Sequence, residues 1–388
     1  MKYSAISLYT GAGGLDYGIE RANFKTLVAI EMDKWCCKTL RHNRQFWNVL
    51  EGRIEDFSTS DILRVADLKK CEADILIGGP PCQPFSKSGY WVKGDVDRLK
   101  DPRANTLHEY MRVLEESLPR SFILENVFGL VYKGKDEGLK YLEERLCQIN
   151  RDHHTKYNFN WKVLNAAHYG VPQIRERVFI VGSREGLPFQ FPEPRFLDVK
   201  DSIVDQQHSF RTAWDALYDL QDGMEDPRIS KVGGKWGELL PTIPEGHNYL
   251  FHSEKGQGLP IFKWRSRYWS FLLKLKKDRP SWTIQAQPGS AIGPFHWNNR
   301  RLNMKEMLRL QTFPFEIEIL GGVSEIQKQI GNAVPSAIGE LLGLEIRKQF
   351  FGENIETQKL TLIPKKSLII PRVTENYPVR SGYPTLSH

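Results

Sequence analysis

The sequence predicts an α/β fold in which a doubly wound, mostly parallel sheet carries a smaller second region. The apolar run from Ala5 to Tyr9 leads directly into Gly11-Ala12-Gly13-Gly14, and the run from Thr26 to Ile30 ends on Glu31. A strand, a glycine-rich turn, a helix and a strand that ends on an acid are typical of a nucleotide-binding half of such a sheet. Residues 1–185 therefore form the first expected domain.

The same alternation continues along this domain. The elements expected next are a helix near 61–66, a strand at 73–77, a helix near 105–116, a strand at 122–124, a helix at 137–149 and strands near 161–164 and 178–181. Proline residues at 188, 192 and 194 mark a boundary. We expect a second region at 186–300 that includes a helix at 210–220, helices at 301–350 that return to the first domain, and a tail at 351–388 that lies along the surface or is partly disordered.

Composition limits the class of protein. The chain has 388 residues, 40% of them hydrophobic, and a net charge of +7. No apolar run approaches the roughly 18 residues of a membrane span, so we expect a cytoplasmic protein. Its five cysteines, Cys36, Cys37, Cys71, Cys82 and Cys147, contain no C-x-x-C pair, which argues against a metal site or a disulfide framework.

The basic surplus is concentrated between Lys255 and Arg301, where ten Lys or Arg face one acid, Asp278, among many aromatic residues. This composition fits a surface for phosphates and bases. We favour that interpretation for Lys263, Arg265 and Arg267. For Lys274, Lys276 and Lys277, which alternate with leucines, we favour the solvated face of a small core.

The glycine-rich turn has Asp16 where a dinucleotide fingerprint carries its third glycine. This departure favours a nucleoside without a diphosphate, such as S-adenosylmethionine. Glu31 is placed to accept hydrogen bonds from ribose hydroxyls.

Three further patterns suggest chemistry. Cys82 lies in a glycine- and proline-rich loop, residues 78–86, and fits either a nucleophile or a small buried thiol. Glu125 ends an apolar strand beside Asn126, so it either faces Cys82 and delivers a proton or serves as a cap or ion-pair partner. Arg175 and Arg177 would project on one face with Gln173 beside them, to hold an anion or form an ordinary surface pair.

Seven motifs, in order, make the chain resemble the DNA cytosine carbon-5 methyltransferase family of bacterial restriction-modification systems. They are Leu8 to Gly14, Glu31, Pro80-Pro81-Cys82-Gln83, Glu125-Asn126-Val127, Gln173-x-Arg175-x-Arg177, Arg301-x-x-x-x-Glu306-x-x-Arg309-Leu310-Gln311 and Gly331-Asn332-Ala333-Val334-Pro335. The resemblance implies a Rossmann-like methyltransferase domain with a target-recognition region at 186–300.

The resemblance also implies residue roles. Cys82 attacks carbon 6 of a flipped cytosine, Glu125 binds and protonates the ring, and Asn126, Arg175 and Arg177 support the site. The residues that it assigns to the cofactor pocket are Tyr9, Gly11, Ala12, Gly13, Gly14, Leu15, Glu31, Met32, Ile54, Pro80, Leu107, Asn332 and Ala333. The residues that it assigns to DNA contact are Gln83, Ser86 and Ser88 of a closing loop and Thr283, beside the basic residues named above.

Two positions depart from the family pattern. Arg53 stands where many members carry an Asp for the adenine amine, and Asp56 is a candidate substitute; Asn105 stands where a glycine is usual. The expected partners are double-stranded DNA, bound by a monomer, and a cognate restriction endonuclease encoded elsewhere. The alternatives are a transfer-RNA methyltransferase on the same scaffold, a catalytically silent DNA-binding relative and a nicotinamide oxidoreductase.

Overall fold

The structure, a computed structural model, describes residues 2–81, 105–127, 137–198, 208–220, 232, 236–265, 268–357, 359–367 and 369–379. Within these residues a seven-stranded sheet has the strand order β3-β2-β1-β4-β5-β8-β6. The strands are β1 (Tyr3–Leu8), β2 (Phe24–Glu31), β3 (Asn48–Glu51), β4 (Ile75–Gly78), β5 (Ser121–Asn126), β6 (Asn158–Asn165) and β8 (Glu176–Ser183).

The sheet is mostly parallel, as the sequence predicts. Strands β3, β2, β1, β4 and β5 run in one direction, and β8 pairs antiparallel with both β5 and β6. The strand order changes direction at β1. This first strand of the chain lies in the middle of the sheet, with β2 and β3 on one side and β4 and β5 on the other. The carboxyl ends of the strands beside such a reversal form a crevice in which ligands bind.

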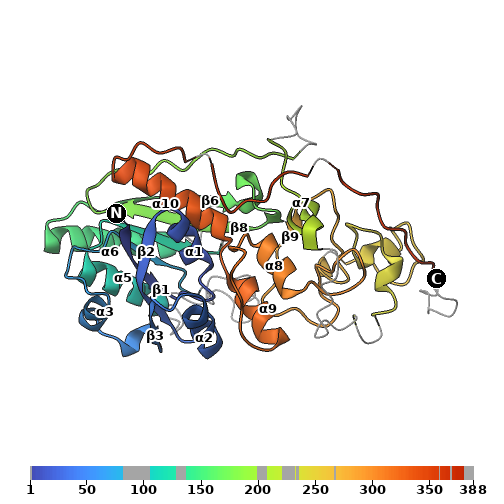
Figure 1. The fold of residues 1–388 in the computed structure, drawn as a ribbon, viewed down its shortest axis with the longest axis horizontal. Helices are drawn as coiled ribbons and strands as arrows, with labels where there is room; N and C mark the ends of the chain where they lie inside the picture. The colour runs from blue at the N-terminus through green and yellow to red at the C-terminus, as the bar shows by residue number, and fades with distance from the viewer. Residues whose placement is uncertain are drawn as a thin grey trace.

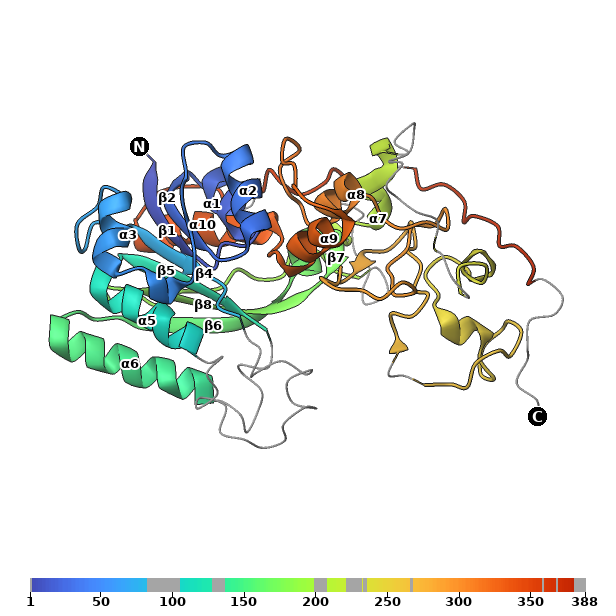
Figure 2. The ribbon, with the colours of Figure 1, turned by 90° about the horizontal axis from the view of Figure 1, so that it is seen from below.

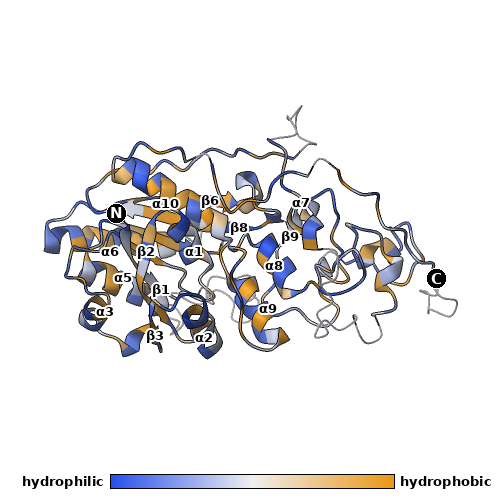
Figure 3. Ribbon diagram, viewed as in Figure 1, coloured by the Kyte–Doolittle hydropathy of each residue, from blue (hydrophilic) through white to orange (hydrophobic). Residues whose placement is uncertain are grey.

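Helices cover both faces of the sheet (Figure 1, Figure 2). One face carries α3 (Thr59–Val65), α5 (Asn105–Ser117) and α6 (Glu137–His153), and the other carries α1 (Gly14–Arg21) and α10 (Ser336–Phe350). Because successive side chains of a strand point to opposite faces, each strand contributes residues to both faces of the sheet. Ile6 and Leu8 pack with α5 and α6, whereas Ala5 packs with α1 and α10. Figure 3 shows the apolar colour gathered on the sheet and on the faces of the helices that cover it.

The C-terminal helix α10 packs closely against the N-terminal helix α1. A Cβ on Gly18 would lie 2.1 Å from the carbonyl oxygen of Ser336, and one on Gly339 would lie 2.5 Å from that of Leu15. These two glycines therefore allow the helix backbones to approach. This contact brings residues 336–350 back against the first helix of the chain, beside β1.

A second apolar cluster joins α2 (Lys34–Asn43) to three helices from later in the chain, α7 (Ala213–Leu217), α8 (Met304–Leu310) and α9 (Val323–Asn332). Helix α7 is shorter than the expected 210–220, because Thr212 caps its start and the chain continues as a 3-10 turn at Tyr218–Leu220. None of the described helices is long and apolar enough to cross a membrane.

Beyond this cluster lies a region that we call the outer lobe, residues 236–265 and 268–297. Its own core includes Leu239, Leu240, Ile243, Tyr249 and Phe295. It has little regular structure besides the short strand β9 (Ser281–Trp282), which pairs in parallel with β7 (Gln173–Ile174). That pairing connects the outer lobe to the chain just before β8.

The outer lobe corrects one expectation from the sequence. Lys274 and Lys277 are 2% and 6% exposed, so they do not belong to a solvated face. The Nζ of Lys274 donates to the carbonyl oxygen of Ile243, and that of Lys277 lies 2.5 Å from Oε1 of Glu245. Burial lowers the pKa of Lys274 to about 8. Lys276 alone fits the expectation, since it forms a half-exposed pair with Asp278.

Candidate active site

The carboxyl ends of β1, β2, β4 and β5 open on a cleft of about 1200 Å³. Glu31 lies on its wall at the end of β2, and Glu125 and Arg177 also line it, at the end of β5 and the start of β8. The sheet therefore brings residues from far-apart stretches of the chain to a shared cavity. Such convergent polar groups in a largely apolar cleft are typical of an active site.

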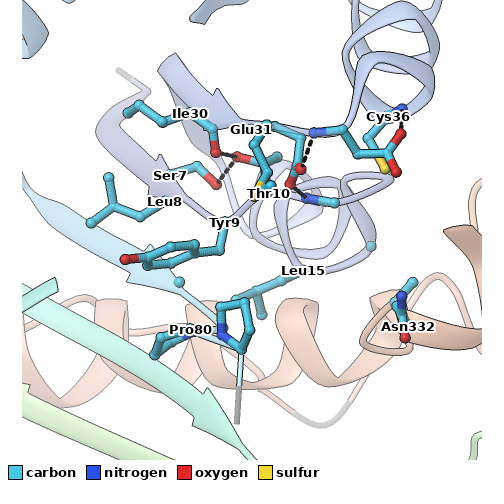
Figure 4. Close-up of a pocket in the computed structure, with 18 of the residues that line it drawn as sticks. Ser7, Leu8, Tyr9, Thr10, Leu15, Ile30, Glu31, Cys36, Pro80 and Asn332 are labelled. Carbon is cyan, nitrogen blue, oxygen red and sulfur yellow. Dashed lines mark hydrogen bonds between the residues drawn. The ribbon is translucent and has the colours of Figure 1, made fainter. Parts of the chain in front are cut away.

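The glycine-rich turn builds one end of the cleft (Figure 4). Tyr9, Gly11 and Gly13 all have positive φ, which reverses the chain between β1 and α1. The Glu31 carboxylate accepts the backbone N–H of Gly11 at 2.7 Å and that of Asp33 at 2.8 Å. Burial raises the pKa of Glu31, and these N–H groups oppose the rise. A carboxylate has acceptor positions beyond these two, so Glu31 can still bind hydroxyl donors in the cleft.

Most residues predicted for a nucleoside line this cleft: Tyr9, Gly11, Gly14, Leu15, Glu31, Met32, Ile54, Pro80, Asn332 and Ala333. Three lie behind its wall instead. Ala12 and Leu107 are 1% and 3% exposed and belong to apolar clusters. A Cβ on Gly13 would meet Leu40 and Tyr17, so Gly13 packs against these side chains and not against the cleft.

The departure at Arg53 has a structural counterpart. Arg53 lines the cleft, but Asp56 does not, because its carboxylate accepts the backbone N–H of Arg53 at 2.9 Å in a capping box. Glu55 is the acid that lines the cleft there, and Asn105 donates to its Oε1 at 3.1 Å. The suggestion that Asp56 replaces the missing Asp is therefore less well supported than the same role for Glu55.

Sequence reasoning missed one ion pair in the cleft. The Nζ of Lys328 on α9 lies 2.6 Å from Oδ2 of Asp33, which also caps α2. Both residues line the cleft. The position of Asp33 just before a helix indicates a cap, but nothing in the sequence pairs it with a lysine 295 positions away.

The other end of the cleft holds a buried acid. Oε1 of Glu125 lies 3.2 Å from Nε of Arg177, and the Glu125 side chain is 14% exposed. Burial raises the pKa of Glu125, while the nearby Arg177 and Arg175 guanidinium groups lower it. The net result is a raised pKa for Glu125, and a shifted carboxyl in a cleft is typical of a functional site.

The turn that precedes Cys82 passes directly beside Glu125. A Cβ on Gly79 would lie 2.8 Å from Oε2 of Glu125, so a side chain at this position would require the Glu125 carboxylate or the turn to shift. Asn126 fixes the turn, since its Nδ2 donates to the carbonyl oxygen of Pro80 at 3.4 Å and its Oδ1 accepts from the Val127 N–H. The described chain reaches Pro81. Cys82, Gln83, Ser86, Ser88 and Arg267 lie outside the described residues.

Arg175 and Gln173 lie behind the site and hold it to later parts of the chain. Arg175 is 2% exposed and donates to the carbonyl oxygen of Gly331 at 3.0 Å; burial lowers its pKa to about 9. Gln173 donates to the Leu310 carbonyl and accepts from the N–H of Ile284. The expected alignment of Gln173 with both arginines is therefore only partly observed, because just Arg177 faces the cleft.

The residues assigned to DNA contact have different environments. Lys263 and Arg265 are exposed on the outer lobe. Thr283 is half-buried, and its hydroxyl donates to the carbonyl oxygen of Ile174 at 2.7 Å, which joins β9 to β7 next to Arg175. Its hydroxyl therefore already has a structural partner, so any contact with DNA would use its remaining acceptor capacity or its methyl group.

The molecule is an α/β protein whose cleft, at the carboxyl ends of the parallel strands, is lined by Glu31 at one end and by the paired Glu125 and Arg177 at the other. A model of C-5 cytosine-specific DNA methylases matches residues 3–348. The chain belongs to this family.

Similar proteins agree with this assignment. The Type II methyltransferase M.SacI of Streptomyces achromogenes is 41% identical over 89% of this chain and 92% of its own length. The Type II methyltransferase M.AquIA of Picosynechococcus is 45% identical over 50% of this chain and 77% of its own length. A solved structure described as a putative DNA modification methyltransferase from an Escherichia coli prophage has a TM-score of 0.63 at 23% identity, over 91% of this chain and all of that one. It shows that the fold is shared.

Proposed function

We propose that this protein transfers a methyl group from S-adenosylmethionine to carbon 5 of a cytosine in duplex DNA. The observation that carries this proposal is the buried Glu125, paired with Arg177 and approached by Gly79 at one end of the cleft whose other end holds Glu31. The same cavity would therefore bind a nucleoside at the Glu31 end and offer the Glu125 carboxyl to a nucleobase at the other end. The turn that leads to Cys82 lies between the two ends.

The residues at the Glu31 end fit the methyl donor. Glu31 would accept the ribose hydroxyls, while Tyr9 and Ile54 would pack on the adenine and Pro80 would border the reacting group. Glu55 would lie near the adenine edge, where Arg53 replaces the family's acid. When bound, S-adenosylmethionine supplies an electrophilic methyl group. A Glu31→Ala variant should lose most binding of S-adenosylhomocysteine by calorimetry, and unchanged binding would argue against this placement.

At the other end Cys82 would act as the nucleophile. Its thiolate forms a bond to carbon 6 of the cytosine, and Glu125 gives its proton to ring nitrogen 3, so that the electron pair of the ring moves to carbon 5. After carbon 5 is methylated it loses its proton to a base, the bond from sulfur to carbon 6 breaks, and nitrogen 3 returns its proton to Glu125. At the end of the cycle Cys82 is again a thiolate and Glu125 again carries its proton.

A cytosine stacked in a duplex cannot reach these groups, so the base must leave the helix. Arg177 would hold the flipped nucleotide, Arg175 would support Arg177 from behind, and Asn126 would fix the turn before Cys82. Residues 186–300 would form the target-recognition domain, with Lys263, Arg265 and Arg267 on the phosphates. Gln83, Ser86 and Ser88 would belong to a loop that closes on the DNA.

Labelled methyl donor with duplex DNA or with transfer RNA tests the substrate. We expect label at cytosine in DNA, and label only in RNA would overturn the proposal in favour of an RNA methyltransferase. DNA that contains 5-fluorocytosine tests the nucleophile, because fluorine cannot leave and the covalent adduct persists. Cys82→Ser should abolish the adduct. Cys71→Ser, at an exposed free thiol, is the matched control and should retain it.

We also propose that the protein is the modification half of a restriction-modification system, acts as a monomer in the cytoplasm and has a separate cognate endonuclease. The support is the resemblance to relatives named Type II methyltransferases. Bisulfite-type mapping of DNA from cells that express the protein should show a single short methylated sequence. Methylated cytosines that share no common surrounding sequence would contradict this role.

A further inference from the structure

After α10 the chain runs along the outside of the molecule as a strap, which we define as the described residues within 359–379. Figures 1 and 2 show it as the dark red segment that passes from the α10 side of the molecule to the far end, near the C-terminal label. These residues form no helix or strand. Their position must therefore be set by the groups that they contact.

Three buried carboxylates in three separate parts of the fold accept backbone N–H groups from the strap. They belong to Glu340 on α10, Asp215 on α7 and Glu245 in the outer lobe, and these residues are 1%, 2% and 4% exposed. The bonds run to Glu340 from the N–H of Thr361 at 2.7 Å and of Leu362 at 3.1 Å, to Asp215 from Ser367 at 2.7 Å, and to Glu245 from Thr374 at 2.8 Å. A buried carboxylate without donors is costly, so the strap is part of the fold at all three places.

Further contacts, from side chains on one side and from the backbone on the other, reinforce the two ends of the strap. On the inner side, Lys366 reaches Asp215 and the carbonyl oxygen of Phe210, and Trp214 donates to the carbonyl oxygen of Ile369 at 2.9 Å. At the far end, the N–H of Tyr377 donates to the carbonyl oxygen of Pro241 in the outer lobe. The strap thus crosses from the sheet region to the outer lobe and bonds on both sides.

The outer-lobe anchor completes a buried ion pair. Lys277 and Glu245 have side chains that are only 8% and 1% exposed. Besides Glu245, the Lys277 ammonium group donates to Oγ1 of Thr374 at 2.8 Å and to the carbonyl oxygen of Arg372 at 3.2 Å. The strap therefore supplies two of the three acceptors that this ammonium group has among the described residues, and the group has three protons to place.

We propose that the strap is a positioning element that holds the outer lobe at a fixed orientation to the cleft, so that DNA bound to one also meets the other. The inference rests on the proposed function, because the outer lobe carries the exposed Lys263 and Arg265 whereas Glu125 and Arg177 lie in the cleft. A lobe that is held in place before binding avoids the entropic cost of ordering it on DNA.

The first test cuts the strap after the protein has folded. A protease recognition sequence inserted between Ile370 and Pro371 lies between the Asp215 and Glu245 anchors, and Ile369 beside it is 78% exposed. The uncut protein should match the wild type and controls for the insertion. Cutting should raise the KM for DNA about tenfold or more, while kcat at saturating DNA and the affinity for S-adenosylhomocysteine stay within about twofold. An unchanged KM for DNA after complete cutting would overturn the proposal.

The second test removes a single anchor. Thr374→Pro deletes two contacts of this anchor, the N–H that Glu245 accepts and the Oγ1 that accepts from Lys277. Val373→Pro is the matched control for a new proline, since Val373 is 57% exposed and its N–H makes none of the hydrogen bonds found among the described residues. We expect the rise in KM for DNA only in Thr374→Pro. Equal values of KM for the two variants would contradict the role of this anchor.

Small-angle X-ray scattering separates a failure of this inference from a failure of the proposed function. Cutting the strap should increase the radius of gyration whether or not the protein methylates DNA. A larger radius in a protein that never labels DNA would leave the strap as a tie between the two regions and reject the DNA substrate. An unchanged radius together with normal DNA methylation would reject the strap alone.

Discussion

The Nε of Arg177 lies 3.2 Å from Oε1 of Glu125, across two neighbouring antiparallel strands. This pair sets the protonation of the one buried acid that the proposed chemistry requires. Burial raises the pKa of Glu125 and the cation lowers it, so the balance between them fixes the pH range in which the acid carries its proton.

Replacing Arg177 should therefore change the pH dependence of the reaction. In Arg177→Met the cation is lost, the pKa of Glu125 rises further, and Glu125 keeps its proton to higher pH. The alkaline limb of the kcat/KM profile should move upward by about one pH unit or more, while the maximal rate falls about 10- to 100-fold because the charge is lost from the site. Arg64→Met, at a position 75% exposed and outside the cleft, should change neither. An unshifted alkaline limb in Arg177→Met would show that Glu125 is not the titrating acid.

Gly79→Ala should impair catalysis more than binding. The added methyl would lie 2.8 Å from Oε2 of Glu125 and must displace that carboxylate or the turn before Cys82. A displacement of about 1 Å can cost about 100-fold in rate, so kcat should fall by that order with little change in affinity for S-adenosylhomocysteine. Gly322→Ala is the control, because its Cβ would meet nothing within 4 Å. Single-turnover kinetics provide the measurement, and a normal rate for Gly79→Ala would argue against close approach of the turn to Glu125.

Asp16 should make folding stability depend on pH. Burial raises the pKa of Asp16 from its ordinary 3.8 to about 7, although Ser7 and Thr26 hydroxyls oppose the rise. The folded state therefore binds more protons than the unfolded state between about pH 4 and 7, so the free energy of unfolding falls as pH rises through that range. A shift of this size corresponds to at most about 4 kcal/mol.

Asp16→Asn removes this titration, because an amide of similar shape stays neutral. The variant should be more stable than the wild type at pH 8 and close to it at pH 5. Urea unfolding at several pH values between 5 and 8 gives both curves. If the wild-type and Asp16→Asn curves run parallel over this range, Asp16 is ionised in the folded protein throughout.

Trp282 should contribute to DNA binding. It is 38% exposed on β9, beside Thr283, and its ring packs edge-on at 5.7 Å from that of the exposed Trp269. Trp282→Ala should raise the KM for DNA about tenfold, the equivalent of roughly 1.4 kcal/mol of lost contact. Trp161→Ala, at a similarly exposed tryptophan on β6 that does not line the cleft, is the control. Equal KM values for the two variants would remove Trp282 from the DNA surface.

The fold could largely be predicted from the sequence. Alternating apolar runs and turn residues located the strands of the sheet, since buried strands must be apolar and parallel strands need crossover helices. The helix predicted at 210–220 was too long, because Thr212 delays its start. The prediction for Lys274 and Lys277 was wrong, because their partners, the Ile243 carbonyl and Glu245, lie about 30 positions earlier and leave no local pattern.

The family and the motif residues that converge on the cleft can be predicted from the sequence, since a strand that ends on Glu31 or Glu125 must present that acid at the sheet edge. Which groups pair with one another is visible in the folded structure and not in the sequence. It placed Arg177 beside Glu125 and Arg175 behind it, assigned Asp33 to Lys328, and bonded the tail to three distant carboxylates. Contacts between residues hundreds of positions apart depend on how whole helices and strands pack. No local sequence pattern indicates such a contact.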